Sequence, residues 1–336
     1  MRFALAINRR SGYNCGMKHR LRSILLPLLA AAIWGTAFVA QDVCADKVPP
    51  LTFNAIRFFI AVLFLLLVKL LITLVKRRKC GPHNSVDECA AKAAKNSGEA
   101  EKSGVKTLLI AGALCGLALA VASGLQQAGL EAGTDSGKAG FITALYVVLV
   151  PIGGLFLKKR FPKVFWAGLA LALVGLYLLC IDGSFRLSAG DLLLLACAAA
   201  FALQILLIDR FAGSLDPISF CIAEFAFGAV FSAIAALITE TPSIGAVIEC
   251  ALPILYVAIF SCGIAYLLQI IAQREGDPAI VSLLFSMEAV FAVIGGAILL
   301  SQRMTAREYA GCALILAAVV IAQLPEGKRR EQGNER

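Results

Sequence analysis

The stretch LTFNAIRFFIAVLFLLLVKLLITLV, residues 51–75, decides the fold class of this chain. The charged residues within it are Arg57 and Lys69. A helix needs about 20 apolar residues to cross the hydrocarbon core of a bilayer, so this stretch is long enough to span a membrane. Its apolar residues are continuous rather than alternating, which indicates a helix and not a strand of a membrane barrel.

The rest of the chain has the same character. Of the 336 residues, 60% are hydrophobic and 16% are charged, whereas a soluble globular protein has about 45–50% apolar and about 25% charged residues. These proportions exclude an ordinary soluble domain, a disordered protein and a disulfide scaffold. The sequence therefore predicts an all-α integral membrane protein with ten transmembrane helices. The predicted spans are residues 23–41, 51–75, 107–129, 139–157, 164–181, 192–208, 217–239, 250–273, 278–300 and 309–324.

The positive charges predict the orientation of these helices, because Lys and Arg collect in the cytoplasmic loops of membrane proteins. With a cytoplasmic N-terminus, the segments on that side carry 24 of the 31 Lys and Arg residues, and the opposite loops carry five. We therefore expect both termini to be cytoplasmic, in a multi-pass protein of the cytoplasmic (inner) membrane. The same bias accounts for the net charge of +9, so no nucleic-acid partner is needed to explain it.

The two halves of the chain resemble each other. When the numbering is shifted by 167, Pro50 coincides with Pro217, and when it is shifted by 143, Gln126 coincides with Gln269. The difference between the two shifts indicates an insertion in the first half, where the polar loop 77–106 lies. Internal repeats of this kind are typical of secondary transporters.

Five spans in each half require the two halves to insert in opposite directions. The loop charges agree, because residues 76–106 carry eight cations and their counterpart around residues 240–249 carries none. We therefore expect two inverted five-helix repeats. The predicted organisation is a cytoplasmic N-terminal segment (1–22), the first repeat (23–181) with its inserted cytoplasmic loop (77–106), the second repeat (190–324) and a cytoplasmic tail (325–336).

Four motifs also resemble a known family. They are WGTAFVAQ (34–41), AIRFFIAVL (55–63), SGKAGFITALYVVLVP (136–151) and SMEAVFAVIGGAILLSQRMT (286–305). Nearly the whole chain is similar to the EamA family of the drug/metabolite transporter (DMT) superfamily. The resemblance implies ten helices in two inverted repeats and the movement of small metabolites, often the export of amino acids. Ala289, Gln302 and Lys159 stand where the family often has a proline or an acidic residue, so no role of those residues is carried over.

Charged residues inside the spans cost about 2.5–3.5 kcal/mol each on insertion scales, so each calls for a reason. Lys69 is near enough to a helix end to reach the headgroups. Arg57, about 10 Å deep, is expected to tie helices together; binding of a substrate carboxylate or phosphate is the alternative. Glu224 coincides with Arg57 at the 167 shift and is also expected to be structural. Glu288 is about 15 Å deep, near the midplane; proton coupling and a neutral packing role are both open.

Other polar side chains inside the spans are candidates for a substrate cavity. Amides, phenols and an indole suit an amphipathic solute of modest size, although each could instead hold helices together. The resemblance points to the same helices. We expect the cavity wall to include members of the set Trp34, Gln126, Tyr146, Gln204, Tyr266, Gln269 and Glu288. Pro151, in the fourth span, is the candidate hinge, because proline leaves a backbone carbonyl without its helical hydrogen bond.

The sequence predicts no cofactor and no metal site. Cys80, His83 and Cys89 share one loop, but two thiols and one imidazole are an incomplete zinc set, so we expect free thiols. The run Met17-Lys18-His19-Arg20 is a good start immediately before the first span. Residues 1–16 are therefore expected to be an upstream extension.

Three classes of function compete. A secondary transporter that works by alternating access agrees with the repeat and with the polar midplane. A membrane-embedded enzyme is disfavoured because both histidines, His19 and His83, lie outside the spans and no GxSxG motif is present. A non-transporting receptor or assembly protein does not require an inverted repeat. We therefore expect a transporter and not an enzyme, with the lipid bilayer and a small-molecule metabolite as partners; a homo-oligomer is left open.

Overall fold

The structure is a computed structural model, and it describes residues 2–79, 98–134, 136–181, 188–299 and 305–322. Every regular element in these ranges is a helix. The helices of the first half are α1 (Arg2–Ala45), α2 (Pro50–Lys79), α4 (Gly98–Glu131), α5 (Ser136–Ala144), α6 (Tyr146–Phe156) and α7 (Lys163–Cys180). Those of the second half are α8 (Ala189–Ala212), α9 (Pro217–Thr239), α10 (Ile244–Glu249), α11 (Ala251–Tyr256), the π-helix η1 (Val257–Ala265), α12 (Tyr266–Glu275), α13 (Pro278–Phe285), α14 (Met287–Leu299) and α15 (Ala306–Ala322).

The described helices agree with the predicted fold class. Six helical segments are long and apolar enough to cross a membrane: Pro50–Val75, Gly104–Glu131, Lys138–Phe156, Ala189–Ala212, Pro217–Thr239 and Ala251–Glu275. Three shorter apolar helices are Arg22–Phe38, Lys163–Leu179 and Pro278–Ile294. These nine segments and α15 fall on the ten predicted stretches. The all-helical class is confirmed, and the number of ten crossings stays a prediction.

The distribution of polarity suits a hydrocarbon environment. On α2, the large apolar side chains of Phe59, Leu63 and Leu67 are all more than half exposed. Asn54 and Arg57 of the same helix are buried. A soluble protein rarely exposes a contiguous apolar surface and rarely buries a charge, so this arrangement is the reverse of the soluble one. The bundle has an apolar outside and keeps its polar groups within.

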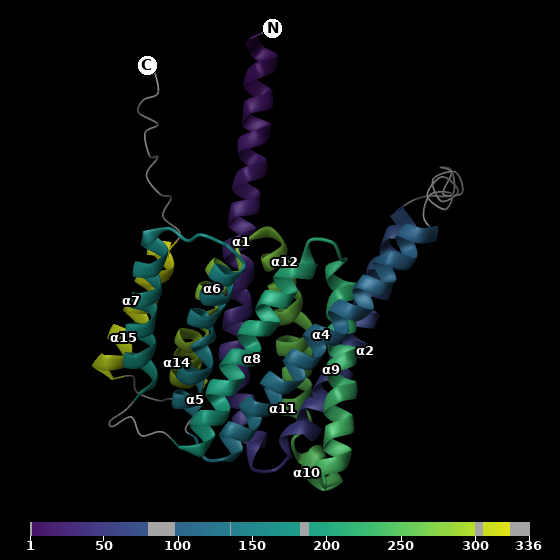
Figure 1. Ribbon diagram of the computed structural model, residues 1–336, viewed down its shortest axis with the longest axis vertical. Coiled ribbons are helices and arrows are strands. Elements are labelled where there is room, and N and C mark those ends of the chain that lie inside the picture. Colours follow the sequence, from purple (N-terminus) through teal and green to yellow (C-terminus); the bar gives the residue numbers. More distant parts are fainter. Residues whose placement is uncertain (1, 80–97, 135, 182–187, 300–304, 323–336) are drawn as a thin grey trace.

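The helices stand side by side as a bundle (Figure 1). Helix α7 packs against α15 at one side of the bundle, and α9 packs against α2 and α4 at the other. Helix α1 runs between them and contacts α12 and α14, while α8 contacts α4, α5 and α6. We call the end where α6 is followed by α7 the basic end, and the end where α1 is followed by α2 the opposite end. The N-terminal part of α1 extends beyond the basic end (Figure 1).

Three of the predicted spans contain an interruption of the regular α-helix. The fourth span is divided at Leu145 into α5 and α6, and the ninth is divided at Ser286 into α13 and α14. At both points a backbone N–H donates to the carbonyl oxygen three residues earlier, as in a 3₁₀ turn. Leu145 N–H donates to the Ile142 oxygen (3.1 Å), and Ser286 N–H donates to the Leu283 oxygen (3.2 Å). The eighth span passes through η1. The segments that contain these points are apolar as a whole, so hydropathy gives no sign of the breaks.

Two helices extend beyond the predicted spans. Helix α1 begins at Arg2, so residues 2–22 are helical and continuous with the first span, and their cytoplasmic location stays a prediction. Helix α4 begins at Gly98, inside the predicted insertion 77–106. Residues 80–97, with the cysteines and the histidine of that loop, and the predicted tail 325–336 lie outside the described residues.

Helices α2 and α9 are tied to each other at both ends. At the opposite end, Glu240 follows the last residue of α9 and accepts hydrogen bonds from the backbone N–H groups of Leu51 (2.8 Å) and Thr52 (2.7 Å). These are orphan donors of the first turn of α2, and a carboxylate there also complements the helix dipole. At the basic end, the Lys69 ammonium donates to the Ser219 hydroxyl at 2.9 Å. Lys69 is thus partly held by α9.

Gly35 allows the closest approach of α1 and α14. A Cβ atom at this position would lie 2.6 Å from the Glu288 carbonyl oxygen and 2.7 Å from the Ala292 nitrogen. Both distances are to backbone atoms, which cannot move aside as a side chain can. The absence of a side chain at Gly35 therefore sets the spacing of the two helices.

We expect Gly35→Ala to destabilise the protein by about 1–3 kcal/mol, because overpacking a close contact forces backbone shifts. Thermal unfolding of the detergent-purified protein measures this as a lower Tm. Gly140→Ala is the matched control, because nothing lies within 4 Å of a Cβ atom at Gly140, and alanine favours the helix. An unchanged Tm for Gly35→Ala would contradict the close contact.

Candidate functional site

An internal cavity lies where the interrupted helices meet α1, α2, α4 and α8. Its empty volume, including the adjoining open space, is about 590 Å³. Its wall consists of Trp34, Phe38, Gln41, Arg57, Ser123, Gln126, Thr143, Tyr146, Phe201, Gln204, Ile205, Ser261, Cys262, Tyr266, Gln269, Phe285 and Glu288.

The structure brings the predicted cavity residues together. All seven candidates, which are Trp34, Gln126, Tyr146, Gln204, Tyr266, Gln269 and Glu288, lie on this one wall. Arg57 is on the wall as well, although we expected a structural role for it. Glu224 and Pro151 are not on the wall. Whether any of these residues binds a solute stays a prediction.

Arg57 is a buried cation with incomplete pairing. One of its terminal nitrogens donates to Gln41 Oε1 at 2.6 Å, and its guanidinium carbon lies 5.1 Å from the ring centroids of both Phe53 and Phe58. Its Nε has no hydrogen-bond partner within the described part of the chain. No carboxylate in that part lies within ion-pair distance of it. The hydrogen bond to Gln41 joins α2 to α1, and the choice between a structural role and substrate binding for Arg57 stays a prediction.

Glu288 lies in the first turn of α14, directly after the break at Ser286. The N-terminus of a helix has unpaired N–H groups and a partial positive charge, so it favours an acidic group. The Glu288 side chain is partly accessible to the cavity. Among the described residues it has no ion pair with another side chain, and both of its interpretations, proton coupling and a neutral packing role, stay open.

Amide side chains of the wall connect three helices. Gln269 Nε2 donates to Gln204 Oε1 (3.3 Å), and Gln204 Nε2 donates to Glu224 Oε1 (2.7 Å). Glu224 is fully buried, and its second carboxylate oxygen has no partner among the described residues. This chain of bonds joins α12 to α8 and α9. This chain of bonds agrees with the structural interpretation of Glu224. Glu224 is not on the cavity wall but accepts a hydrogen bond from Gln204, which is.

Aromatic rings form the apolar part of the wall. The Trp34 ring makes edge contacts with Tyr266 and Phe285, at centroid distances of 5.1 and 5.0 Å. Its indole Nε1 is buried and has no partner in the described structure. The wall therefore combines an apolar surface with an unused hydrogen-bond donor.

Several wall residues were not predicted from the sequence. Phe38 and Gln41 follow Trp34 at positions i+4 and i+7, and Ser123 and Phe201 precede Gln126 and Gln204 by three. The helical period alone would have placed these on the same faces as the candidates. By contrast, Ser261 and Cys262 reach the wall through η1, and no sequence signal for that π-helix was recognised; π-helical turns are frequent at functional sites. The other members not predicted are Thr143, Ile205 and Phe285.

Pro151 does not lie at the interruption of the fourth span. It is buried inside α6, which continues through it, and the interruption of the fourth span lies at Leu145 instead. Thr143 and Tyr146, on either side of Leu145, are both on the cavity wall. A hinge at Pro151 stays a prediction.

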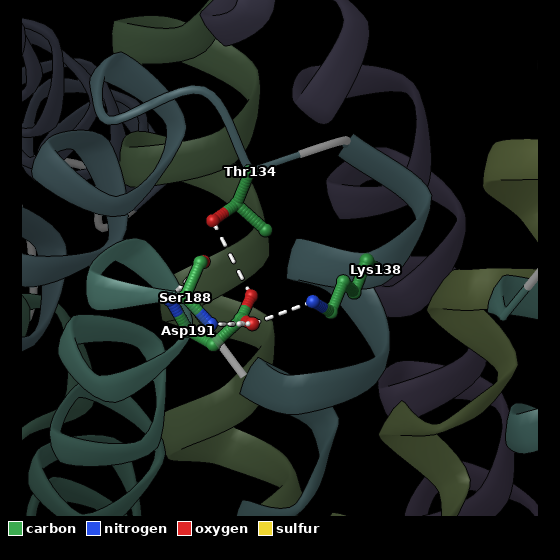
Figure 2. A network of polar contacts seen from close by, with 4 residues as sticks. All are labelled: Thr134, Lys138, Ser188 and Asp191. Atoms are coloured by element: carbon green, nitrogen blue, oxygen red, sulfur yellow. Dashed lines mark hydrogen bonds and ion pairs between the residues drawn. The ribbon is translucent and has the colours of Figure 1, made fainter. Parts of the chain in front are cut away.

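Ion pairs fix the fourth span against α8 at both ends. At the opposite end, the Asp191 carboxylate is fully buried and pairs with the Lys138 ammonium, while accepting a hydrogen bond from Ser188 N–H (2.7 Å); Thr134 Oγ1 lies 3.4 Å away (Figure 2). Ser188 and Asp191 also form a reciprocal capping box at the start of α8. At the basic end Lys159 of the connection after α6 pairs with Asp209 of α8 at 2.8 Å. The two half-helices on which Thr143 and Tyr146 lie are therefore held from outside the cavity.

Comparison with known proteins identifies the family. The sequence profile of the EamA-like transporter family matches residues 21–181 and again residues 188–323. The chain belongs to the EamA-like transporter family. An uncharacterized transporter of Archaeoglobus fulgidus is 32% identical over 308 residues, which cover 91% of this chain and 87% of that protein. A crystal structure with a TM-score of 0.67 and 21% identity covers 90% of this chain and 96% of that one, and shows a shared fold.

These matches confirm the predicted EamA membership within the DMT superfamily. This EamA-like chain is a multi-pass membrane protein, and the family and its relative support a transporter rather than an enzyme. Among the described residues, no group of three or more His, Cys, Asp or Glu is placed to hold a metal ion.

We expect Asp191→Asn to lower the free energy of unfolding by about 3–5 kcal/mol, because it breaks a buried ion pair from one side. Glu249→Gln is the matched control. Its partner Lys47 lies 3.6 Å away, but the two side chains are 49% and 67% exposed, and exposed pairs contribute at most about 1 kcal/mol. Chemical unfolding in detergent micelles measures both. Equal losses in the two variants would contradict the assigned role of the Asp191 network.

Proposed function

We propose that this EamA-like chain is a secondary transporter that exports amino acids or related amphipathic solutes by alternating access. One observation carries the proposal. The same cavity wall holds a cation, Arg57, and an acid, Glu288, and neither pairs with an oppositely charged side chain in the described part of the molecule. A zwitterionic amino acid has the two complementary charges.

Arg57 is the proposed site for the substrate carboxylate. Its guanidinium is a planar group of hydrogen-bond donors suited to a carboxylate, and its Nε is still without a partner among the described residues. The hydrogen bond from Arg57 to Gln41 fixes the group without neutralising its charge. The position on the wall favours the substrate-binding alternative over the purely structural role first expected.

Glu288 is the proposed site for the substrate ammonium and for a coupled proton. A carboxyl group that binds either a proton or a cationic substrate exchanges one for the other, which is a physical basis for antiport. The rings of Trp34, Tyr266 and Phe285 offer an apolar surface for the substrate side chain, and the amides of Gln126 and Gln269 offer hydrogen bonds that orient it.

The packing of the helices supports the inverted repeat. If α1 to α7 form one repeat and α8 to α15 the other, a two-fold axis exchanges equivalent pairs. The contact of α4 with α9 has its counterpart in η1 with α2, and α1 with α14 corresponds to α8 with α6. The pairs α2 with α9 and α7 with α15 are their own counterparts. The two separate profile matches agree with this division.

The interrupted helices supply a means of alternating access. The breaks at Leu145 and Ser286 nearly coincide at the 143 shift, so both repeats have a discontinuous helix beside the cavity. Transporters of inverted repeats commonly bind substrate at such breaks. We propose that the basic end faces the cytoplasm, as the distribution of Lys and Arg predicts, and that solute moves from that end to the opposite end.

We expect Arg57→Gln to reduce amino acid transport about 10- to 100-fold, because a charge-assisted hydrogen bond contributes about 1.5–3 kcal/mol. The measurement is efflux of a mixture of isotope-labelled L-amino acids from proteoliposomes. The matched control is Lys69→Gln, which removes another cation of α2, away from the cavity, and should stay within about twofold of the wild type.

Monodispersity of the purified Arg57→Gln protein checks its folding. If the variant folds and transports at the wild-type rate, Arg57 does not bind the substrate. If the wild type moves no amino acid but moves solutes that lack a carboxylate, the amino acid assignment is wrong and the transporter assignment stands.

We expect Glu288→Gln to abolish the pH dependence of transport and the movement of protons that accompanies solute efflux. The reason is that glutamine keeps the shape of the side chain but cannot exchange a proton. A pH-sensitive dye inside the proteoliposomes measures the protons. Glu224→Gln is the control, because Glu224 lies behind Gln204 and not on the wall; it should keep proton movement. Unchanged pH-dependent transport by Glu288→Gln would exclude proton coupling at this residue.

A further inference from the structure

Cys44 and Cys250 form a pair of neighbouring thiols at the opposite end of the bundle. Cys44 lies one residue before the end of α1, and Cys250 joins α10 to α11, which lie low in Figure 1. Both side chains are buried, with 0% and 1% of their surface exposed, and they belong to one apolar cluster. The Cys250 side chain is a neighbour of the Cys44 thiol.

Neighbouring residues hold this contact on both sides. The Lys47 ammonium lies 3.6 Å from Glu249 Oε2, so an ion pair connects the same two segments beside the thiols. The Cys44 carbonyl oxygen accepts from Lys47 N–H (3.1 Å) and the Cys250 N–H donates to Ala246 (3.0 Å), which fixes each cysteine in a turn of backbone. The two cysteines therefore come together from ordered segments that belong to different halves of the chain.

The place of this pair distinguishes it from the other buried cysteines. Cys115, Cys197, Cys221 and Cys262 lie inside helices of the membrane-spanning bundle. Cys44 and Cys250 instead lie next to connections at the end of the bundle. This end faces away from the cytoplasm if the proposed orientation is right, and disulfides persist in extracytoplasmic compartments.

We propose that Cys44 and Cys250 form an intramolecular disulfide bond that joins the end of α1 to the junction of α10 and α11. The proposal rests on the orientation in the proposed function and otherwise on the contact of the two residues. It adds a covalent modification site that transport itself does not require.

The bond forms by exchange with an extracytoplasmic protein disulfide, which is the oxidant. One cysteine thiolate of the pair attacks a sulfur of that disulfide, which gives a mixed disulfide and releases one donor thiolate. The second thiolate of the pair then attacks the first cysteine sulfur, forms the Cys44–Cys250 bond and releases the second donor thiolate. The pair loses two electrons and two protons, and the donor disulfide is reduced to a dithiol.

The exchange takes place before the apolar cluster closes. In the folded protein, burial raises the pKa of the Cys44 thiol, and the neighbouring Cys250 side chain raises the pKa further. Because the thiolate is the attacking species, such a thiol reacts slowly. The bond is therefore made during insertion and is then protected. It limits the separation of α1, which carries Trp34 and Gln41, from the span that carries Ser261 and Tyr266 on the facing wall.

The test is a thiol count on the denatured, full-length protein from cells. Free thiols are blocked with N-ethylmaleimide during lysis in detergent, disulfides are reduced, and new thiols are labelled with maleimide-polyethylene glycol. We expect two added labels in the wild type and in Cys115→Ser, a matched control with an equally buried thiol. Cys44→Ser and Cys250→Ser should each lose both labels. Non-reducing peptide mass spectrometry of the wild type, which needs no variant, should find the two cysteine peptides linked.

Three results would overturn the proposal. The first is a wild type with no disulfide in cells or after treatment of the purified protein with oxidised glutathione, which would contradict the contact itself. The second is a bond that forms only with the added oxidant, which would place the pair on the reducing side and overturn the orientation too. The third is a link from Cys44 to a different cysteine. None of these readouts depends on transport, so a failure of the substrate assignment is seen separately.

Discussion

The cost of placing an unpaired polar group in hydrocarbon is the constraint on which the rest of this structure depends. Backbone N–H and C=O groups must bond within the chain, so a membrane protein of this size is built from helices. Irregular backbone is tolerated where it lines an internal space. The breaks at Leu145 and Ser286 and the π-helix η1 all adjoin wall residues of the cavity. The same cost explains why Phe59 and Leu63 lie on the exposed face of α2, whereas Asn54 and Arg57 lie on its buried face.

The two halves share a plan but differ in chemistry. Gln126 and Gln269 are counterparts in the sequence, and both line the cavity. Arg57 and Glu224 are counterparts too, yet the cation is on the wall while the acid is screened from it by Gln204. The wall therefore holds a cation, Arg57, from the first half of the chain and an acid, Glu288, from the second.

Hydropathy was enough to predict the helices, because an apolar run of this length is typical of a membrane-spanning helix. The polar residues inside these runs were enough to predict seven members of the cavity wall. Other features were hidden from the sequence. The break at Leu145 depends on one backbone bond to Ile142 rather than on a residue that forbids helix, and Pro151, which does disfavour helix, lies within α6. The position of Arg57 on the wall depends on how α2 is rotated, and depth along a helix gives no information about rotation. The Cys44–Cys250 contact joins segments that are far apart in the sequence.

The carboxylate of Glu240 has a consequence for biogenesis. It is the group that binds the backbone N–H groups of Leu51 and Thr52, but it is synthesised long after them, in the other half of the chain. Until the ribosome has made α9 and the bilayer has received it, the first turn of α2 must find its partners in water or in lipid headgroups. The residue that ends α9, in the second half, thus completes the first turn of α2, in the first half, and this capping contact forms only when both halves are in place.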